Sequence, residues 1–133
     1  MTEKHDLIGD YKEYAEKNAF MAYNRIEIVS ADENCAVVRV ELRPESMNLH
    51  GAVHGGLLYG MADCVAGVVA RANGEDYVTQ SAHINFLRNV TQGTVYARAD
   101  VVRRGRRIVV THVAVTDGEG RLLADCAVDL IAM

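Results

Sequence analysis

The sequence predicts an α+β domain in which one antiparallel β-sheet wraps around one long helix. Three observations lead to this fold class. Apolar residues alternate in several short segments, a long apolar stretch lies between the first two of these segments and the last four, and glycine-containing turns join the last three. Strands that are segregated from a single central helix favour an antiparallel sheet packed on that helix.

The first half of the chain is expected to contain two helices and two strands. Residues 6–20 carry apolar side chains at helical spacing, so they predict a short N-terminal helix. Residues 23–30 are expected to form a strand, and residues 36–43 alternate as a half-buried strand does. The long central helix is expected over residues 55–72, where Gly74 suits the left-handed position that follows a helix.

The second half predicts four strands. Their apolar residues alternate, and turns that contain Gly105 and Gly118 join the last three of them into hairpins. In the segment after the helix, Thr79, Ser81 and His83 are expected to share one side of the strand. The expected strands cover residues 77–87, 94–103, 108–116 and 122–130.

Length and composition restrict the function classes. A chain of 133 residues is expected to form a single domain, residues 1–133, and its net charge of −4 gives no overall basic footprint for nucleic acid or an anionic membrane. The charged N-terminus does not resemble a signal peptide, and no apolar run reaches the roughly 20 residues of a membrane span. Three isolated cysteines favour reduced thiols in a cytoplasmic protein over disulfides or a metal site.

Asp63 is a lone carboxylate within the apolar central helix. A carboxylate in a buried helix destabilises the protein unless the carboxylate is paired, hydrated or needed for function. The residues that share its helical stripe are small, so a second backbone or a thin ligand could approach the carboxylate closely. The alternative is a helix that packs against a sheet or a partner, with Asp63 capping or paired to an arginine. The small residues of this stripe are Gly56, Gly60, Gly67 and Ala70.

The segment before this helix carries a resemblance to a known family. Asn48-x-His50-Gly51-x-x-His54-Gly55-Gly56, followed seven residues later by Asp63, resembles the active-site segment of hotdog-fold acyl-CoA thioesterases. The similarity is to the PaaI-like branch, which is similar to the 4-hydroxybenzoyl-CoA thioesterases. It extends over nearly the whole chain. It implies a hotdog fold, hydrolysis of an acyl-CoA to a free acid and coenzyme A without a metal or organic cofactor, and a homodimer or homotetramer with active sites at the dimer interface.

The resemblance also implies catalytic roles. Asp63 would act as general base toward water, or as the nucleophile that forms a mixed anhydride. Gly55 would donate its free helix-terminal N–H to the oxyanion. Asn48 would donate to the thioester carbonyl, His54 would orient the loop or the leaving group's surroundings, and Ser81 would help to position the attacking water. Without the motif, Asn48 would be read as a turn residue and His54 as a structural histidine.

Four further residues are expected to contact the substrate or support its site. Gly56 would allow close approach to the helix start, and His50 would brace the loop by hydrogen bonding. Arg104 and Arg106 belong to an arginine-rich hairpin tip, and they are expected to contact the phosphates of coenzyme A. The alternative for such a tip is a solvated surface. Nucleic acid is disfavoured because the chain has no Trp and only two Phe as stacking platforms.

Two other functions stay open at this point. One is a non-catalytic hotdog domain that binds acyl-CoA and has a regulatory role. Binding alone, however, does not require an acid in the helix. The other is a hotdog dehydratase or hydratase, although those enzymes combine histidine and acid in a different motif.

Overall fold

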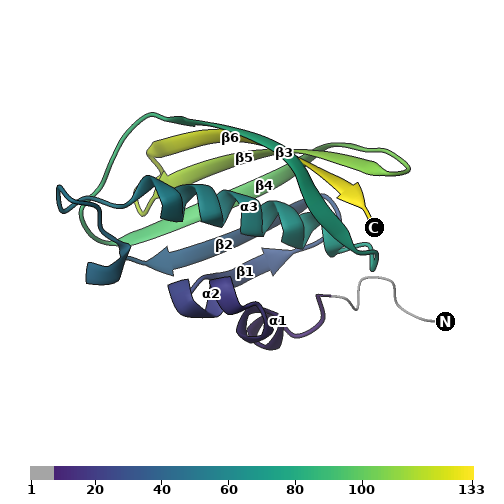
Figure 1. Ribbon diagram of the computed structural model, residues 1–133, viewed down its shortest axis with the longest axis horizontal. Helices are drawn as coiled ribbons and strands as arrows, with labels where there is room; N and C mark the ends of the chain where they lie inside the picture. Colours follow the sequence, from purple (N-terminus) through teal and green to yellow (C-terminus); the bar gives the residue numbers. More distant parts are fainter. Residues whose placement is uncertain (1–7) are drawn as a thin grey trace.

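The structure is a computed structural model that describes residues 8–133. Two short helices precede the first strand, and one long helix separates the second strand from the third (Figure 1). The helices are α1 (Tyr11–Lys17), α2 (Ala19–Asn24) and α3 (Gly55–Arg71), and a 3-10 turn covers Pro44–Ser46. The strands are β1 (Glu27–Ala31), β2 (Cys35–Glu41), β3 (Tyr77–Phe86), β4 (Thr94–Arg104), β5 (Ile108–Asp117) and β6 (Leu122–Ala132).

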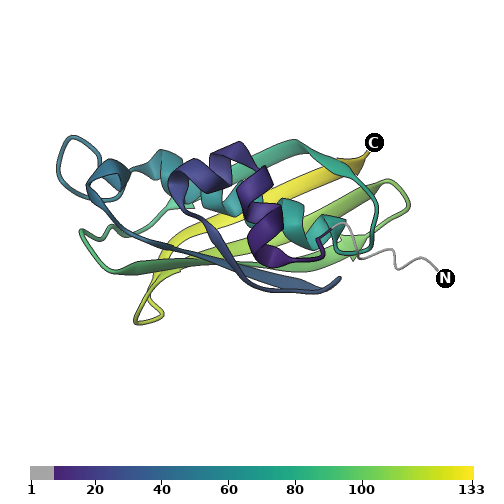
Figure 2. The ribbon, with the colours of Figure 1, turned by 90° about the horizontal axis from the view of Figure 1, so that it is seen from below.

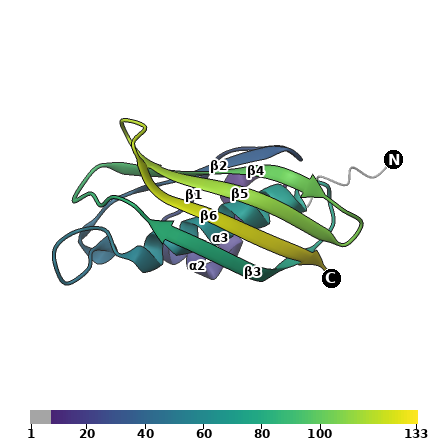
Figure 3. The same cartoon turned by 90° about the horizontal axis from the view of Figure 1, so that it is seen from above.

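All six strands belong to one antiparallel sheet with the order β1-β2-β4-β5-β6-β3. The strand that follows α3 therefore lies at the sheet margin, next to the last strand of the chain (Figure 3). Within residues 8–133, β3 pairs only with β6, so its other edge carries no strand. The predicted α+β class, with an antiparallel sheet around one central helix, is confirmed.

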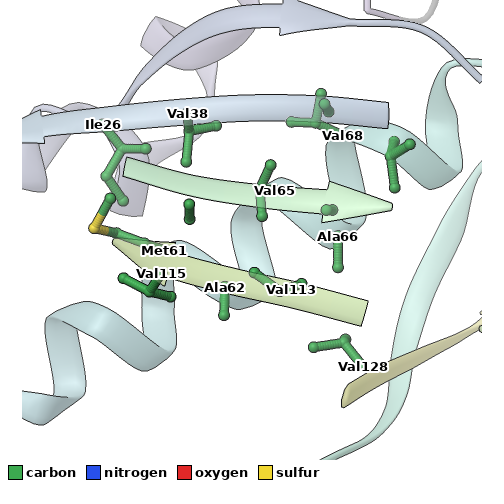
Figure 4. Packing of buried hydrophobic residues seen from close by; sticks show 14 of the residues in the cluster. Ile26, Val38, Met61, Ala62, Val65, Ala66, Val68, Val113, Val115 and Val128 are labelled. Atoms are coloured by element: carbon green, nitrogen blue, oxygen red, sulfur yellow. The ribbon is translucent and has the colours of Figure 1, made fainter. Parts of the chain in front are cut away.

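The core lies between α3 and the concave face of the sheet. Met61, Ala62, Val65 and Ala66 of α3 are fully buried, and they meet the inward-facing valines of β2, β5 and β6 (Figure 4). Removal of this apolar surface from water is the main force that holds the helix on the sheet. No helix in the described part of the chain has the length and hydrophobicity needed to cross a membrane.

The N-terminal region differs from the prediction in two respects. The expected helix over residues 6–20 is divided at Asn18, and residues 6 and 7 lie outside the described residues. Asn18 ends α1 and its side chain accepts the N–H of Met21, so it caps α2. The expected strand over residues 23–30 begins only at Glu27, because α2 continues to Asn24 and Arg25 then takes a left-handed conformation.

The other predicted elements differ from the observed ones by at most a few residues at either end. The alternation in β2 and β4 correctly identifies Ala36, Val38, Val95 and Ala97 as inward-facing. The two hairpins of the second half also form as expected, joining β4 to β5 and β5 to β6 (Figure 1).

Arg104 fixes the C-terminal end of α3 to the rest of the fold. Its guanidinium donates hydrogen bonds to the carbonyl oxygens of Ala70 at 3.0 Å and Val69 at 2.9 Å, and to that of Glu33 at 2.9 Å. The last carbonyls of a helix lack intrahelical partners and carry the negative end of its dipole, so a cation is favourable there. The geometry assigns Arg104 a structural role. Its predicted contact with coenzyme A stays a prediction, and it would have to be made by a guanidinium that already holds three backbone carbonyls.

Replacing Arg104 with Met should destabilise the protein. The substitution leaves three backbone carbonyls without their charged donor. A hydrogen bond to a charged group contributes about 1.5–3 kcal/mol, and water replaces part of this at the exposed carbonyl of Glu33 and the half-buried helix end, so a loss of about 2–4 kcal/mol in the free energy of unfolding is expected. Chemical denaturation of Arg104→Met measures it. Arg107→Met is the control, because Arg107 is exposed in the same hairpin. Equal stability of the two variants would contradict the structural role.

Candidate active site

The loop before α3 is held by its own hydrogen bonds. Asn48 Oδ1 accepts the N–H groups of His50 at 2.8 Å and Ala52 at 3.1 Å, and the Asn48 N–H donates to the carbonyl of Ala52. Gly51 takes the positive φ that closes this turn. Asn48 thus has a turn-forming role through its oxygen. Its amide Nδ2 forms no hydrogen bond with the described residues, so that group is available to a ligand.

His54 is the N-cap of α3. Its Nδ1 accepts the N–H of Gly56 at 2.8 Å, which satisfies one of the donors that a helix start leaves without partners. The N–H of Gly55 takes part in no hydrogen bond among residues 8–133. The cap therefore leaves the Gly55 N–H as the open donor at this helix start. The predicted role of His54, to orient the loop or the surroundings of the leaving group, stays a prediction beside this capping contact.

Asp63 contacts β3 through a residue that the sequence analysis did not select. Its Oδ1 accepts a hydrogen bond of 2.5 Å from Thr79 Oγ1, and both side chains are exposed in the described chain. A carboxylate that accepts one hydroxyl in this way is oriented while its second oxygen stays accessible. The signal in the sequence was Thr79 itself, a hydroxyl at the start of the strand that follows the helix.

Ser81 lies on the other face of the sheet from Thr79. Thr79 pairs with Leu130, which is buried on the helix side, whereas Ser81 pairs with Asp129 on the outer side. A β-bulge at Gln80 causes this change, because the extra residue shifts the alternation by one position. Ser81 Oγ donates to Asp129 Oδ2 at 3.4 Å. The expectation that Ser81 shares a side with Thr79 is therefore wrong, and the hydroxyl at Asp63 is that of Thr79.

Asp63 and the Gly55 N–H are far apart within one chain. Both lie on α3, and Asp63 follows Gly55 by more than two turns. At 1.5 Å per residue this separation is about 12 Å along the helix axis. A single thioester carbonyl cannot sit at the Gly55 N–H and also be attacked by a group on the Asp63 of the same helix.

Two of the small residues beside Asp63 are covered from within the chain. A Cβ on Gly60 would lie 2.7 Å from the Phe20 ring, and one on Gly67 would lie 2.6 Å from an Arg71 guanidinium nitrogen. Arg71 itself bonds Tyr14 and Asp76. The predicted open stripe is thus closed at these two positions by Phe20 of α2 and by Arg71. Figure 2 shows the two N-terminal helices on the side of α3 that is seen from below.

The neighbouring thiol does not compete with Asp63 as a nucleophile. Burial, with the adjacent Asp63 carboxylate as a smaller cause, raises the pKa of Cys64 to about 12. The reactive form of cysteine is the thiolate, so Cys64 stays protonated and unreactive near neutral pH. Cys35, Cys64 and Cys126 are all free thiols, as predicted.

The remaining predicted residues are less constrained. His50 is exposed, and only its backbone N–H takes part in the loop's hydrogen bonds. Arg106 is exposed in the hairpin between β4 and β5, and its contact with coenzyme A stays a prediction. Gly56 is exposed beside the capping ring of His54. No group of three or more potential metal ligands occurs among residues 8–133.

Comparison with known protein families gives a match over much of the chain. The model of the thioesterase superfamily matches residues 50–124, which include Asp63, Thr79 and the helix start. The acyl-coenzyme A thioesterase PaaI of Escherichia coli K12 is 30% identical over 100 residues, which cover 74% of this chain and 71% of that protein.

Solved structures show the same fold. The E. coli PaaI structure has a TM-score of 0.89 and 24% identity, over 99% of this chain and 96% of that one. A hypothetical thioesterase from Streptococcus pneumoniae TIGR4, solved with coenzyme A, has a TM-score of 0.84 and 26% identity, over 93% and 97% of the two chains. The same S. pneumoniae protein has been solved as an aspartate-to-alanine and a threonine-to-alanine variant. With its hotdog fold and the matched segment around Asp63, the chain belongs to the thioesterase superfamily.

Proposed function

We propose that this protein hydrolyses an acyl-CoA thioester to a carboxylic acid and coenzyme A, at sites that two subunits form together. The observation that carries the proposal is the Asp63 carboxylate, held by Thr79 on β3, whose outer edge carries no strand of residues 8–133. Family membership supports thioester hydrolysis, and the coenzyme A bound to the S. pneumoniae relative supports the substrate class.

Strand β3 suggests how two subunits would complete the site. Its first half holds Thr79 against Asp63, and its last residue, Phe86, lies against Gly55, where an added Cβ would be 3.2 Å from the ring. If β3 pairs antiparallel with β3 of a second copy, the Phe86 end of one strand lies beside the Thr79 end of the other. This pairing would bring each Asp63 toward the Gly55 N–H of the partner. The two groups of one site would then come from different subunits, so their distance along α3 within one chain would not limit the reaction.

The proposed reaction then follows from the groups at this site. The thioester carbonyl oxygen lies at the partner's Gly55 N–H, with the amide of Asn48 as a second donor. Asp63 takes a proton from water as the water oxygen attacks the carbonyl carbon, and the N–H stabilises the negative charge that develops on the oxygen. The C–S bond then breaks, and the thiolate of coenzyme A leaves and is protonated. In the alternative route, a carboxylate oxygen of Asp63 attacks the carbonyl carbon, and the C–S bond breaks to expel the thiolate of coenzyme A, which is protonated. Water then hydrolyses the resulting anhydride, which releases the carboxylic acid and regenerates the Asp63 carboxylate.

Thr79 would align Asp63 for either route. In two alanine variants of the S. pneumoniae relative, the changed aspartate and threonine are separated by as many positions as Asp63 and Thr79 are here. This agreement supports a shared aspartate–threonine pair. Ser81, which the sequence analysis expects to help position the attacking water, lies on the other face of the sheet from Thr79, and that role stays a prediction.

Asp63→Asn should abolish turnover and leave binding intact. The amide has nearly the same shape but cannot take a proton, so kcat should fall on the order of 100- to 10,000-fold. Release of free thiol from short, medium, long and aryl acyl-CoAs measures activity, and titration with a non-hydrolysable acyl-CoA thioether measures binding. If the wild type binds these thioethers but releases no thiol from any acyl-CoA, the protein is a binding domain. Equal activity of the variant would remove Asp63 from the mechanism.

Thr79 offers a matched pair of substitutions. Thr79→Val keeps the shape and removes the hydroxyl, so kcat should fall on the order of tenfold, the effect expected for one hydrogen bond to a charged group. Thr79→Ser retains the hydroxyl and should stay close to the wild type. If both variants lose the same activity, the hydroxyl has no role in aligning Asp63.

Gly55 allows the backbone N–H to be removed on its own. Gly55→Pro deletes the donor at the first helical position, where proline is well tolerated, and the preceding His54 has the extended conformation that proline favours. Loss of one oxyanion donor should lower kcat on the order of 100-fold. Gly55→Ala is the control, because it introduces the same Cβ near Phe86 and retains the N–H. An equal loss in both variants would show a steric effect of the Cβ.

A further inference from the structure

Phe20 places an aromatic ring against α3, one turn before the candidate catalytic carboxylate. It belongs to α2, and its ring atoms lie against Gly60, so close that a Cβ at Gly60 would be 2.7 Å from them. Gly60 precedes Asp63 by one turn on the same helix, so both residues share one face of α3. The ring is therefore a near neighbour of the Asp63 site although it comes from a distant part of the sequence.

The fold does not bury this ring. Met21, the next residue, is fully buried and anchors α2 to the core, and Asn18 caps the helix. Phe20, in contrast, remains 49% exposed. An aromatic side chain is among the larger sources of apolar surface in a protein, and half of this surface is left for another group to cover.

The two sides of Asp63 along α3 differ in polarity. One turn before it, Gly60 carries the Phe20 ring, and one turn after it, Gly67 carries the Arg71 guanidinium with its partners Tyr14 and Asp76. A thioester has an apolar acyl group on one side of its carbonyl and the polar arm of coenzyme A on the other. The apolar group matches the Phe20 side, because apolar surfaces associate when both are removed from water.

We propose that the acyl group of the substrate packs against the exposed face of Phe20 above Gly60. This contact makes the enzyme prefer acyl groups larger than acetyl, with aromatic acyl groups gaining from stacking on the ring. The inference rests on the proposed thioesterase function and names the substrate class of that site. Phe20 is a specificity-determining residue, and Gly60 is required because only glycine lets the ring approach α3 this closely.

Phe20→Ala should change selectivity. The values of kcat/KM for benzoyl-CoA and hexanoyl-CoA should fall about tenfold relative to that for acetyl-CoA, since acetyl is too short to cover the ring. Leu122→Ala is the control. Leu122 is an apolar residue, 39% exposed, at the start of β6, whereas α2 lies on the β1 side of the sheet, so its loss should leave all three values unchanged.

Gly60→Ala tests the same contact from the helix side. The added methyl group displaces the Phe20 ring, so the single variant should also lose selectivity for the larger acyl groups. In the Phe20→Ala background no ring remains to be displaced, and Gly60→Ala should then have no further effect on selectivity. Additive effects of the two substitutions would contradict the contact as the cause.

A binding measurement separates this inference from the proposed function. The dissociation constants of the non-hydrolysable thioethers S-ethyl-, S-hexyl- and S-benzyl-CoA are measured for the wild type and Phe20→Ala. The hexyl and benzyl compounds should bind about tenfold more weakly to the variant, and the ethyl compound nearly unchanged. This result supports the inference even if the wild type hydrolyses nothing, in which case only the proposed function fails. An equal change for all three compounds, or none, overturns the inference.

Discussion

Burial of one side of α3 against the concave sheet fixes the positions of Asp63 and of the Gly55 N–H. The apolar side chains from Leu57 to Ala70 hold the helix on the sheet, and they thereby set which side of it faces outward. Asp63 lies on that outward side, next to the marginal strand β3. The same rigid helix holds the Gly55 N–H and the carboxylate about 12 Å apart. The structure thus separates, within one chain, two groups that the proposed reaction requires together.

The marginal position of β3 resolves this conflict in physical terms. A strand with an unpaired edge can pair with another strand, and proteins that expose such an edge usually cover or use it. Here the two ends of that one strand contact the two separated groups, Asp63 through Thr79 and Gly55 through Phe86. A two-fold pairing of β3 with β3 of a second subunit, as proposed above, would therefore bring the two groups together.

The sequence predicted the parts of this structure that repeat regularly. Alternation located β2 and β4 and their inward faces, because a sheet that is buried on one side requires a period of two. It failed at Gln80, where one extra residue leaves the composition of the strand unchanged but moves Thr79 and Ser81 to opposite faces. The break at Asn18 was also missed, since helical spacing continues across a residue that ends one helix and caps the next.

The candidate site residues also differ in whether the sequence alone could locate them. The motif located the loop, the helix start and Asp63, because these are adjacent in sequence. It could not identify contacts between distant segments, such as Arg104 with the end of α3 or Phe20 with Gly60, because those depend on how the elements pack. The N-terminal helices therefore have a larger part in the site than their sequence suggests, since α2 brings an aromatic ring to the helix that carries the acid.

Subunit complementation tests the central claim most directly. Asp63→Asn and Gly55→Pro chains, each with a different affinity tag, are produced together, and the mixed dimers are purified through both tags. If each site combines Asp63 of one subunit with Gly55 of the other, every mixed dimer retains one intact site and should have about half of the wild-type turnover per dimer. If each site lies within one chain, the mixed dimers will be no more active than the two single-variant proteins, and that result would contradict the account.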